Sequence, residues 1–157
     1  GSGCIALSVL NNTGDTTAIA LDLSEKALNI AKRNAERLSL IDRISFICGD
    51  ALSDKTDGKF DAVISNPPYV TSEAYKSLEP EIYFEPEMAF LGGDDGLIFY
   101  RKIISLYKDS LKEGGFFAFE IGYDQADAIF SIAKENSLEA RIVKDLSGND
   151  RVAILRP

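Results

Sequence analysis

The chain has 157 residues, of which 45% are hydrophobic and 27% charged, proportions that are typical of one soluble globular domain. It contains no histidine, which excludes histidine-based triads and the usual zinc sites, and we expect no metal centre. Acidic residues outnumber basic ones by 25 to 17, and this excess disfavours a nucleic-acid-binding surface.

Strand-like and helical patterns alternate along the chain. The apolar stretch CIALSVL predicts a helix that ends near residues 11–14, and TTAIALD predicts a strand covered on both faces. Ser24 is the predicted N-cap of the next helix, whose apolar residues recur at helical spacing. Later strands are predicted at ISFIC, FDAVIS and GGFFAFEI, and later helices at residues 97–111 and 124–136. Residues 71–96 are predicted to be irregular.

This alternation predicts an α/β fold with a mostly parallel sheet and helices on both faces. The last two strands, EARIVKDL and RVAILRP, are separated only by the turn Ser147–Asp150. That connection is too short for a crossover, so we expect a C-terminal antiparallel hairpin.

Ligands of such sheets bind beyond the carboxyl ends of the strands, and the unusual residue groups fall there. Gly1-Ser2-Gly3 precedes the first helix, where glycine lets the backbone approach a ligand and helix N–H groups are free. Asp22 ends a strand about 20 residues later, the position of a carboxylate that binds ribose hydroxyls; the alternative is a helix cap. Asp50 could accept from an adenine amine or serve only as a turn residue.

The stretch ISNPPY follows the apolar strand FDAVI. Two successive prolines cannot donate ladder hydrogen bonds, so the strand must stop there. The side chain of Asn66 and nearby backbone carbonyls are then left at the strand's carboxyl end, where they could receive a planar NH₂ group. The alternative is a proline-stopped strand with a core tyrosine at Tyr69.

Together, these motifs resemble those of class I S-adenosylmethionine-dependent methyltransferases, which have a Rossmann-like fold. NPPY is similar to the motif of members that methylate amino groups, and FEPEMAFLGGDDGLIFYRKI and FEIGYDQ resemble the PrmC/HemK family. The resemblance implies transfer of a methyl group from S-adenosylmethionine to the side-chain amide (N5) of a glutamine in peptide chain release factors.

The resemblance also implies site residues. Asn66, Pro67 and Tyr69 would be catalytic. The cofactor would be bound by Gly1, Ser2, Gly3, Asp22, Leu23, Asp50, Ala51 and Asn66. The substrate would be bound by Asn66, Pro67, Pro68, Tyr69, Glu85 and Pro86.

The family also carries an N-terminal helical domain and a first strand that lies in the middle of the sheet, and neither is found in this sequence. We therefore expect residues 1–157 to be the catalytic domain of a longer protein.

Two other functions are compatible with the motifs. NPPY would also suit a flipped base, as in a nucleic-acid methyltransferase acting on adenine N6 or guanine N2. The stretch from Glu79 to Tyr100, which contains no lysine or arginine, argues against a bound polyanion. The third possibility is a non-catalytic module that binds adenosine or a partner protein.

The remaining expectations concern location and surface. The chain has no apolar run of about 18 residues and no basic signal-peptide start, so we expect no membrane contact. Cys4 and Cys48 lie in separate apolar runs and are predicted to be buried, reduced thiols of a cytoplasmic protein. Glu85-Pro86 and the loop Gly92–Gly96 are predicted to form either a lid over the substrate or a plain surface loop.

Overall fold

The computed structural model describes residues 1–76 and 89–157. The chain divides into two compact units, residues 1–54 and residues 55–157, and each unit is described by itself.

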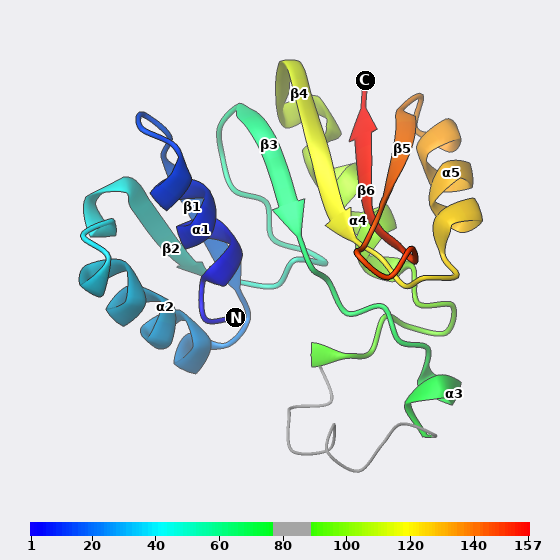
Figure 1. The fold of residues 1–157 in the computed structure, drawn as a ribbon, viewed down its shortest axis with the longest axis horizontal. Coiled ribbons are helices and arrows are strands. Elements are labelled where there is room, and N and C mark those ends of the chain that lie inside the picture. The colour runs from blue at the N-terminus through cyan, green and yellow to red at the C-terminus, as the bar shows by residue number, and fades with distance from the viewer. Residues whose placement is uncertain (77–88) are drawn as a thin grey trace. The chain divides into compact units, whose positions relative to one another are not determined.

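The first unit is a two-stranded parallel sheet with two helices (Figure 1). Its elements are α1 (Cys4–Asn12), β1 (Ala18–Asp22), α2 (Glu25–Arg37), the 3₁₀ turn η1 (Ile41–Arg43) and β2 (Ile44–Cys48). Ala18 pairs with Ile44 at one end of the sheet and Asp22 with Cys48 at the other. The carboxyl ends of β1 and β2 therefore meet at one edge, as the sequence predicts.

The start of helix α2 agrees with the prediction from the sequence. The Ser24 hydroxyl accepts a hydrogen bond from the backbone N–H of Ala27 at 3.2 Å, which confirms Ser24 as the N-cap. The apolar side of α2 packs toward the sheet. The buried core of this unit comes from both helices, the residue before η1 and β2: Leu7, Leu10, Ala35, Leu40 and Ile44.

The second unit is a four-stranded sheet in the order β3-β4-β6-β5. Its elements are β3 (Phe60–Ser65), α3 (Ser72–Tyr75), α4 (Ile98–Tyr107), the 3₁₀ turn η4 (Lys108–Ser110), β4 (Leu111–Glu120), α5 (Ala126–Glu135), β5 (Glu139–Lys144) and β6 (Asp150–Arg156). β3 and β4 are parallel, whereas β6 runs antiparallel to both β4 and β5. The predicted C-terminal hairpin is confirmed.

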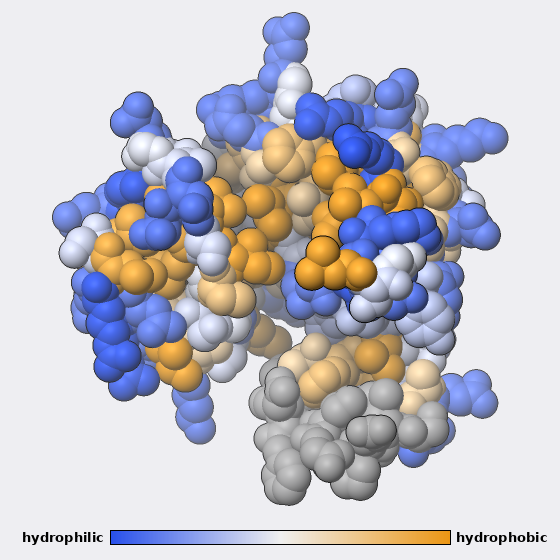
Figure 2. Space-filling model, viewed as in Figure 1, coloured by the Kyte–Doolittle hydropathy of each residue, from blue (hydrophilic) through white to orange (hydrophobic). Residues whose placement is uncertain are grey.

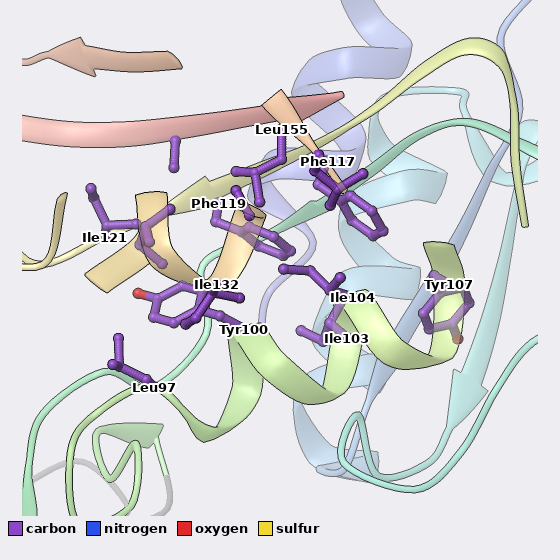
Figure 3. Packing of buried hydrophobic residues seen from close by; sticks show 14 of the residues in the cluster. Leu97, Tyr100, Ile103, Ile104, Tyr107, Phe117, Phe119, Ile121, Ile132 and Leu155 are labelled. Atoms are coloured by element: carbon purple, nitrogen blue, oxygen red, sulfur yellow. The ribbon is translucent and has the colours of Figure 1, made fainter. Parts of the chain in front are cut away.

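Alternate residues of β4 build the core of this unit (Figure 3). Phe117 and Phe119 are fully buried, and β6 places Leu155 and Ala153 opposite them on the same face. Helices α4 and α5 pack against that face with Tyr100, Ile104, Ile129 and Ile132 among their buried residues. The core thus holds the carboxyl ends of β3 and β4 in a fixed register, with Ser65 beside Phe119.

Apolar side chains also reach the surface of both units (Figure 2). On the strands these include Ile19 of β1, Ile47 of β2 and Ile64 of β3, all about two-fifths exposed. In the described part of the chain, β1 pairs only with β2 and β3 only with β4. No helix within that part is both long and apolar enough to cross a membrane.

Two expectations from the sequence need correction. Cys4 and Cys48 are free thiols, as predicted, but both are exposed rather than buried. Cys4 opens α1, and Cys48 ends β2 with its thiol near the Leu23 carbonyl oxygen at 3.6 Å. An apolar sequence neighbourhood therefore does not bury a residue at the very end of an element. The helix predicted to reach residue 111 ends at Tyr107 and gives way to a 3₁₀ turn.

Candidate active site

The predicted cofactor-binding residues of the first unit come together at one sheet edge. The backbone N–H of Gly49 donates to the Asp22 carbonyl oxygen at 3.1 Å, which joins the ends of β1 and β2. The Asp22 carboxylate contacts the amino group of Gly1 through Oδ2. The glycine turn, Asp22 and the Gly49-Asp50 pair are thus neighbours although they are far apart in sequence.

Asp22 is not the helix cap. Its Oδ1 accepts from the backbone N–H of Ser24 at 2.7 Å, and Ser24 itself caps α2. One carboxylate oxygen therefore fixes the turn that follows β1, while the other is directed toward the glycine turn. This arrangement suits a carboxylate that receives a ligand hydroxyl.

Asp50 also has a turn role. Its Oδ1 accepts from the Leu52 N–H at 2.8 Å, and its own N–H donates to Asp54 Oδ2 at 2.8 Å. Beside these two carboxylates, the Leu23 side chain is exposed and Ala51 is half-buried. The turn interpretation of Asp50 is confirmed, and its proposed contact with a base stays a prediction.

The glycine turn needs glycine at Gly3. This residue has a φ of 80°, in the left-handed region, and a Cβ there would lie 3.0 Å from the Ala31 Cβ and 3.3 Å from the Leu7 Cδ1. A side chain at this position would push the turn away from α2. The tight fit brings the backbone at the start of α1 close to α2.

The second unit carries the stretch Asn66–Tyr69 directly after β3. Asn66 is exposed, Pro67 is buried, and Tyr69 is half-buried with its ring against the core of the unit. Among the described residues, none is hydrogen-bonded to the Asn66 side chain. The side chain of Asn66 is thus exposed on its unit, next to the buried Pro67.

The segment is held from behind by the loop Gly92–Gly96. Val70 forms a parallel bridge with Leu91, and the Gly92 N–H donates to the Val70 carbonyl oxygen at 2.8 Å. A Cβ at Gly92 would lie 2.8 Å from the Pro68 carbonyl oxygen, and one at Gly96 would collide with the Tyr69 carbonyl oxygen. These glycines pack on the backbone of the motif, and the lid interpretation stays untested.

Gln125 completes this support, and sequence reasoning gave it no role. Its side-chain amide hydrogen-bonds the Tyr69 and Gly96 carbonyl oxygens, the Gly122 N–H and the Tyr100 hydroxyl. Burial is the main cause that raises the pKa of Tyr100 far above its ordinary value, so this hydroxyl stays protonated. The stretch FEIGYDQ contains Gln125, but nothing in that stretch indicates a contact with Tyr69.

The two predicted groups lie in different units. The residues predicted to bind the cofactor, Asn66 apart, belong to residues 1–54, whereas Asn66–Tyr69 belong to residues 55–157. Each group is assembled within its own unit. Glu85 and Pro86, predicted to bind the substrate, lie outside the described residues.

The description "Methyltransferase small domain" belongs to a family model that matches residues 1–83, more than half of the chain. The chain belongs to this family. Solved methyltransferase structures have a similar fold. A ribosomal protein L11 methylase from Lactobacillus delbrueckii subsp. bulgaricus has a TM-score of 0.67 and 23% sequence identity. The match covers 99% of this chain and 64% of that one. A methyltransferase from Pyrococcus furiosus has a TM-score of 0.70 at 21% identity, covering 99% and 70%. The Rossmann-like class I methyltransferase fold is confirmed.

Within the methyltransferase small domain family, named relatives are more specific. The release factor glutamine methyltransferase of Caulobacter vibrioides is 42% identical over 156 residues, covering 98% of this chain and 54% of that protein. The protein of the same name from Fusobacterium nucleatum is 39% identical over 160 residues, covering 99% and 45%. The resemblance inferred from the motifs is confirmed, and the chain spans about half the length of these relatives.

Proposed function

We propose that the protein containing this chain methylates the side-chain amide nitrogen of a glutamine in a peptide chain release factor, with S-adenosylmethionine as methyl donor. The observation that carries the proposal is Asn66. Its amide is exposed and without a partner among the described residues, directly after a strand whose end is fixed by buried Pro67 and the core. The names of the 42% and 39% identical relatives support the same substrate.

An amide nitrogen is a poor nucleophile because its lone pair is delocalised into the carbonyl group. The Asn66 side-chain oxygen and the Pro67 backbone carbonyl would accept the two N–H groups of the substrate amide. These acceptors fix the orientation of the nitrogen and favour its tetrahedral form in the transition state. Orientation of this kind is worth about 7–11 kcal/mol when the geometry is well held.

The other residues would act without acid–base chemistry. Tyr69 would form a wall beside the substrate amide. The methylated nitrogen becomes more acidic and loses its proton afterwards, so the absence of a histidine base is no obstacle. The cofactor would supply a methyl group that is activated by its sulfonium charge.

The residues of the first unit fit an adenosine-containing cofactor. The Asp22 side chain is 26% exposed, and its Oδ2 contacts the amino group of Gly1 at the edge where the turn passes through the tightly packed Gly3. A carboxylate in this place can accept from two ribose hydroxyls. Asp50 and exposed Leu23 lie at the same edge, where they would contact the base.

The direct test is methyl transfer by the full-length enzyme. Labelled S-adenosylmethionine is incubated with a release factor from the same cell, and the labelled residue is identified by mass spectrometry. We expect one methyl group on a glutamine amide. Label on a lysine, or no transfer to the release factor while RNA or DNA is methylated, would overturn the proposal.

Asp22 offers a separate prediction for the cofactor. We expect Asp22→Ala to weaken S-adenosylmethionine binding by about 1.5–3 kcal/mol, the range for a hydrogen bond to a charged group, as measured by calorimetry. Asp22→Asn retains the acceptor for Ser24 N–H and should also weaken binding because the charge is lost. Asp15→Ala, an exposed carboxylate before β1, is the matched control and should bind normally. If Asp22→Ala left the affinity for S-adenosylmethionine unchanged, the function of Asp22 would be limited to its hydrogen bond with the Ser24 N–H.

Nucleic acid provides the contrasting prediction. With a net charge of −8 on this chain, we expect short DNA and RNA duplexes and single strands to show no saturable binding at physiological salt. Fluorescence anisotropy with labelled oligonucleotides measures this directly. A submicromolar complex would favour the base-methylating alternative instead.

We further propose that these residues form the catalytic domain of a longer protein. The chain covers 54% and 45% of the two named relatives, and β1 and β3 each pair with one strand only in the described part. Limited proteolysis of the full-length protein should release a resistant fragment that contains this chain.

A further inference from the structure

We propose that Gln125 is a positioning residue for methyl transfer: its side-chain amide fixes the backbone that carries Asn66. This inference rests on the proposed function. It concerns the second unit alone, where β3, β4, α4 and α5 are held in one core.

The hydrogen bonds of Gln125 specify the orientation of its amide. Nε2 lies 3.3 Å from the carbonyl oxygens of both Tyr69 and Gly96, and these oxygens can only accept. Oε1 lies 2.9 Å from the Gly122 N–H, which can only donate. If the amide were flipped, Oε1 would face two carbonyl oxygens and Nε2 would face the Gly122 N–H, so none of the three hydrogen bonds could form. The amide is therefore fully used and held in one orientation.

The hydroxyl of Tyr100 lies beside the same amide but can donate or accept, so the orientation rests on the three backbone contacts. It lies 3.1 Å from Gln125 Oε1 and 3.0 Å from the Glu120 carbonyl oxygen, and Tyr100 is fully buried in the core. The ring also packs edge-on against Phe119 at 5.5 Å. The Gly122 N–H, just after β4, thus holds Oε1, with the Tyr100 hydroxyl shared between Oε1 and the Glu120 carbonyl oxygen, and Nε2 links this end of β4 to Tyr69.

Between the end of β3 and Val70, the segment has no strand partner within residues 1–76 and 89–157. Pro67 and Pro68 have no N–H to donate, so residues between Ser65 and Val70 cannot be held by a regular ladder. The carbonyl oxygen of Tyr69 instead receives the Gln125 amide, and the loop glycines leave no space around it. A shift of Tyr69 would be passed through two rigid prolines to Asn66. Displacements of about 1 Å can cost about 100-fold in rate when catalysis depends on orientation.

The test compares two amide-to-carboxylate variants on the same helix in the full-length enzyme. Gln125→Glu keeps the acceptor for Gly122 and Tyr100 but places a carboxylate oxygen against two carbonyl oxygens. Asn136→Asp is the control: Asn136 caps the other end of α5, where its Nδ2 donates to the Ile132 carbonyl oxygen at 2.9 Å. A negative charge is favourable at the N-terminus of α5 and unfavourable at its C-terminus, so the control introduces the same charge with the larger cost from the helix dipole.

We expect Gln125→Glu to lower kcat by about 10- to 100-fold while S-adenosylmethionine affinity and the KM for the release factor change little. Asn136→Asp should retain the parental kcat.

Hydrogen exchange of backbone amides gives a readout that does not depend on activity. The Val70 and Gly92 amides, which bond to Phe90 and Val70, should exchange faster in Gln125→Glu than in the parent or in Asn136→Asp. A parent enzyme that does not methylate glutamine would refute the proposed function, and faster exchange would still support positioning. Unchanged exchange, or a kcat no lower than that of Asn136→Asp, would overturn the inference.

Discussion

Replacing Asn66 with alanine is expected to abolish most methyl transfer and to leave cofactor binding intact. The Asn66 side chain is exposed and makes no hydrogen bond with any described residue, so its removal leaves none of those residues without a partner. Loss of one oriented polar contact to a reacting group typically lowers turnover by about 10²–10³-fold. Single-turnover rates of methyl incorporation into a release factor measure the effect, and calorimetry measures S-adenosylmethionine affinity.

Asn66→Asp is the sharper variant because an acceptor oxygen is kept while a charge is introduced. It should retain more activity than Asn66→Ala, provided that the carboxylate is not driven out of the site by desolvation. A control amide outside the predicted site residues is Asn12→Ala, at the end of α1, which should transfer methyl groups at the parental rate. Full activity of Asn66→Ala would contradict the role proposed for this side chain.

Most of the fold was predictable because its signals are local. The strand FDAVIS, the cap at Ser24 and the C-terminal hairpin follow from apolar periodicity and turn residues, and all three are confirmed. The two prolines of NPPY predict where β3 must stop and so place Asn66 at its carboxyl end. The stretch is therefore recognisable without any knowledge of its neighbours.

The support behind the motif was not predictable for a physical reason. Gln125 lies 56 positions from Tyr69, and a half-buried amide with four partners has the same sequence signature as any polar residue near a helix start. The burial of Cys4 and Cys48 was predicted wrongly because apolar neighbours in sequence do not report which side of an element faces solvent. Such features depend on contacts between elements, which periodicity does not encode.

Phe119→Ala is expected to cause the largest loss of stability in the second unit. The Phe119 ring is fully buried, stacks on Phe117 with centroids 5.6 Å apart and meets Tyr100 edge-on at 5.5 Å. Removing a buried phenylalanine ring costs about 3–5 kcal/mol, since the core collapses only partly into the space. Each ring–ring contact that is lost adds about 0.5–1.5 kcal/mol to the decrease in the free energy of unfolding.

Denaturant unfolding of the full-length protein measures this change, with Phe130→Ala as the matched control. Phe130 lies on α5 and is 45% exposed, so its truncation should change the free energy of unfolding by less than about 1 kcal/mol. Phe119→Leu should be intermediate because it fills much of the cavity. Phe119 lies beside Ser65, the residue before Asn66, so kcat should fall in Phe119→Ala even at temperatures where the variant is folded. A stability loss no greater than that of Phe130→Ala would show that this core does not hold the carboxyl end of β3 in place.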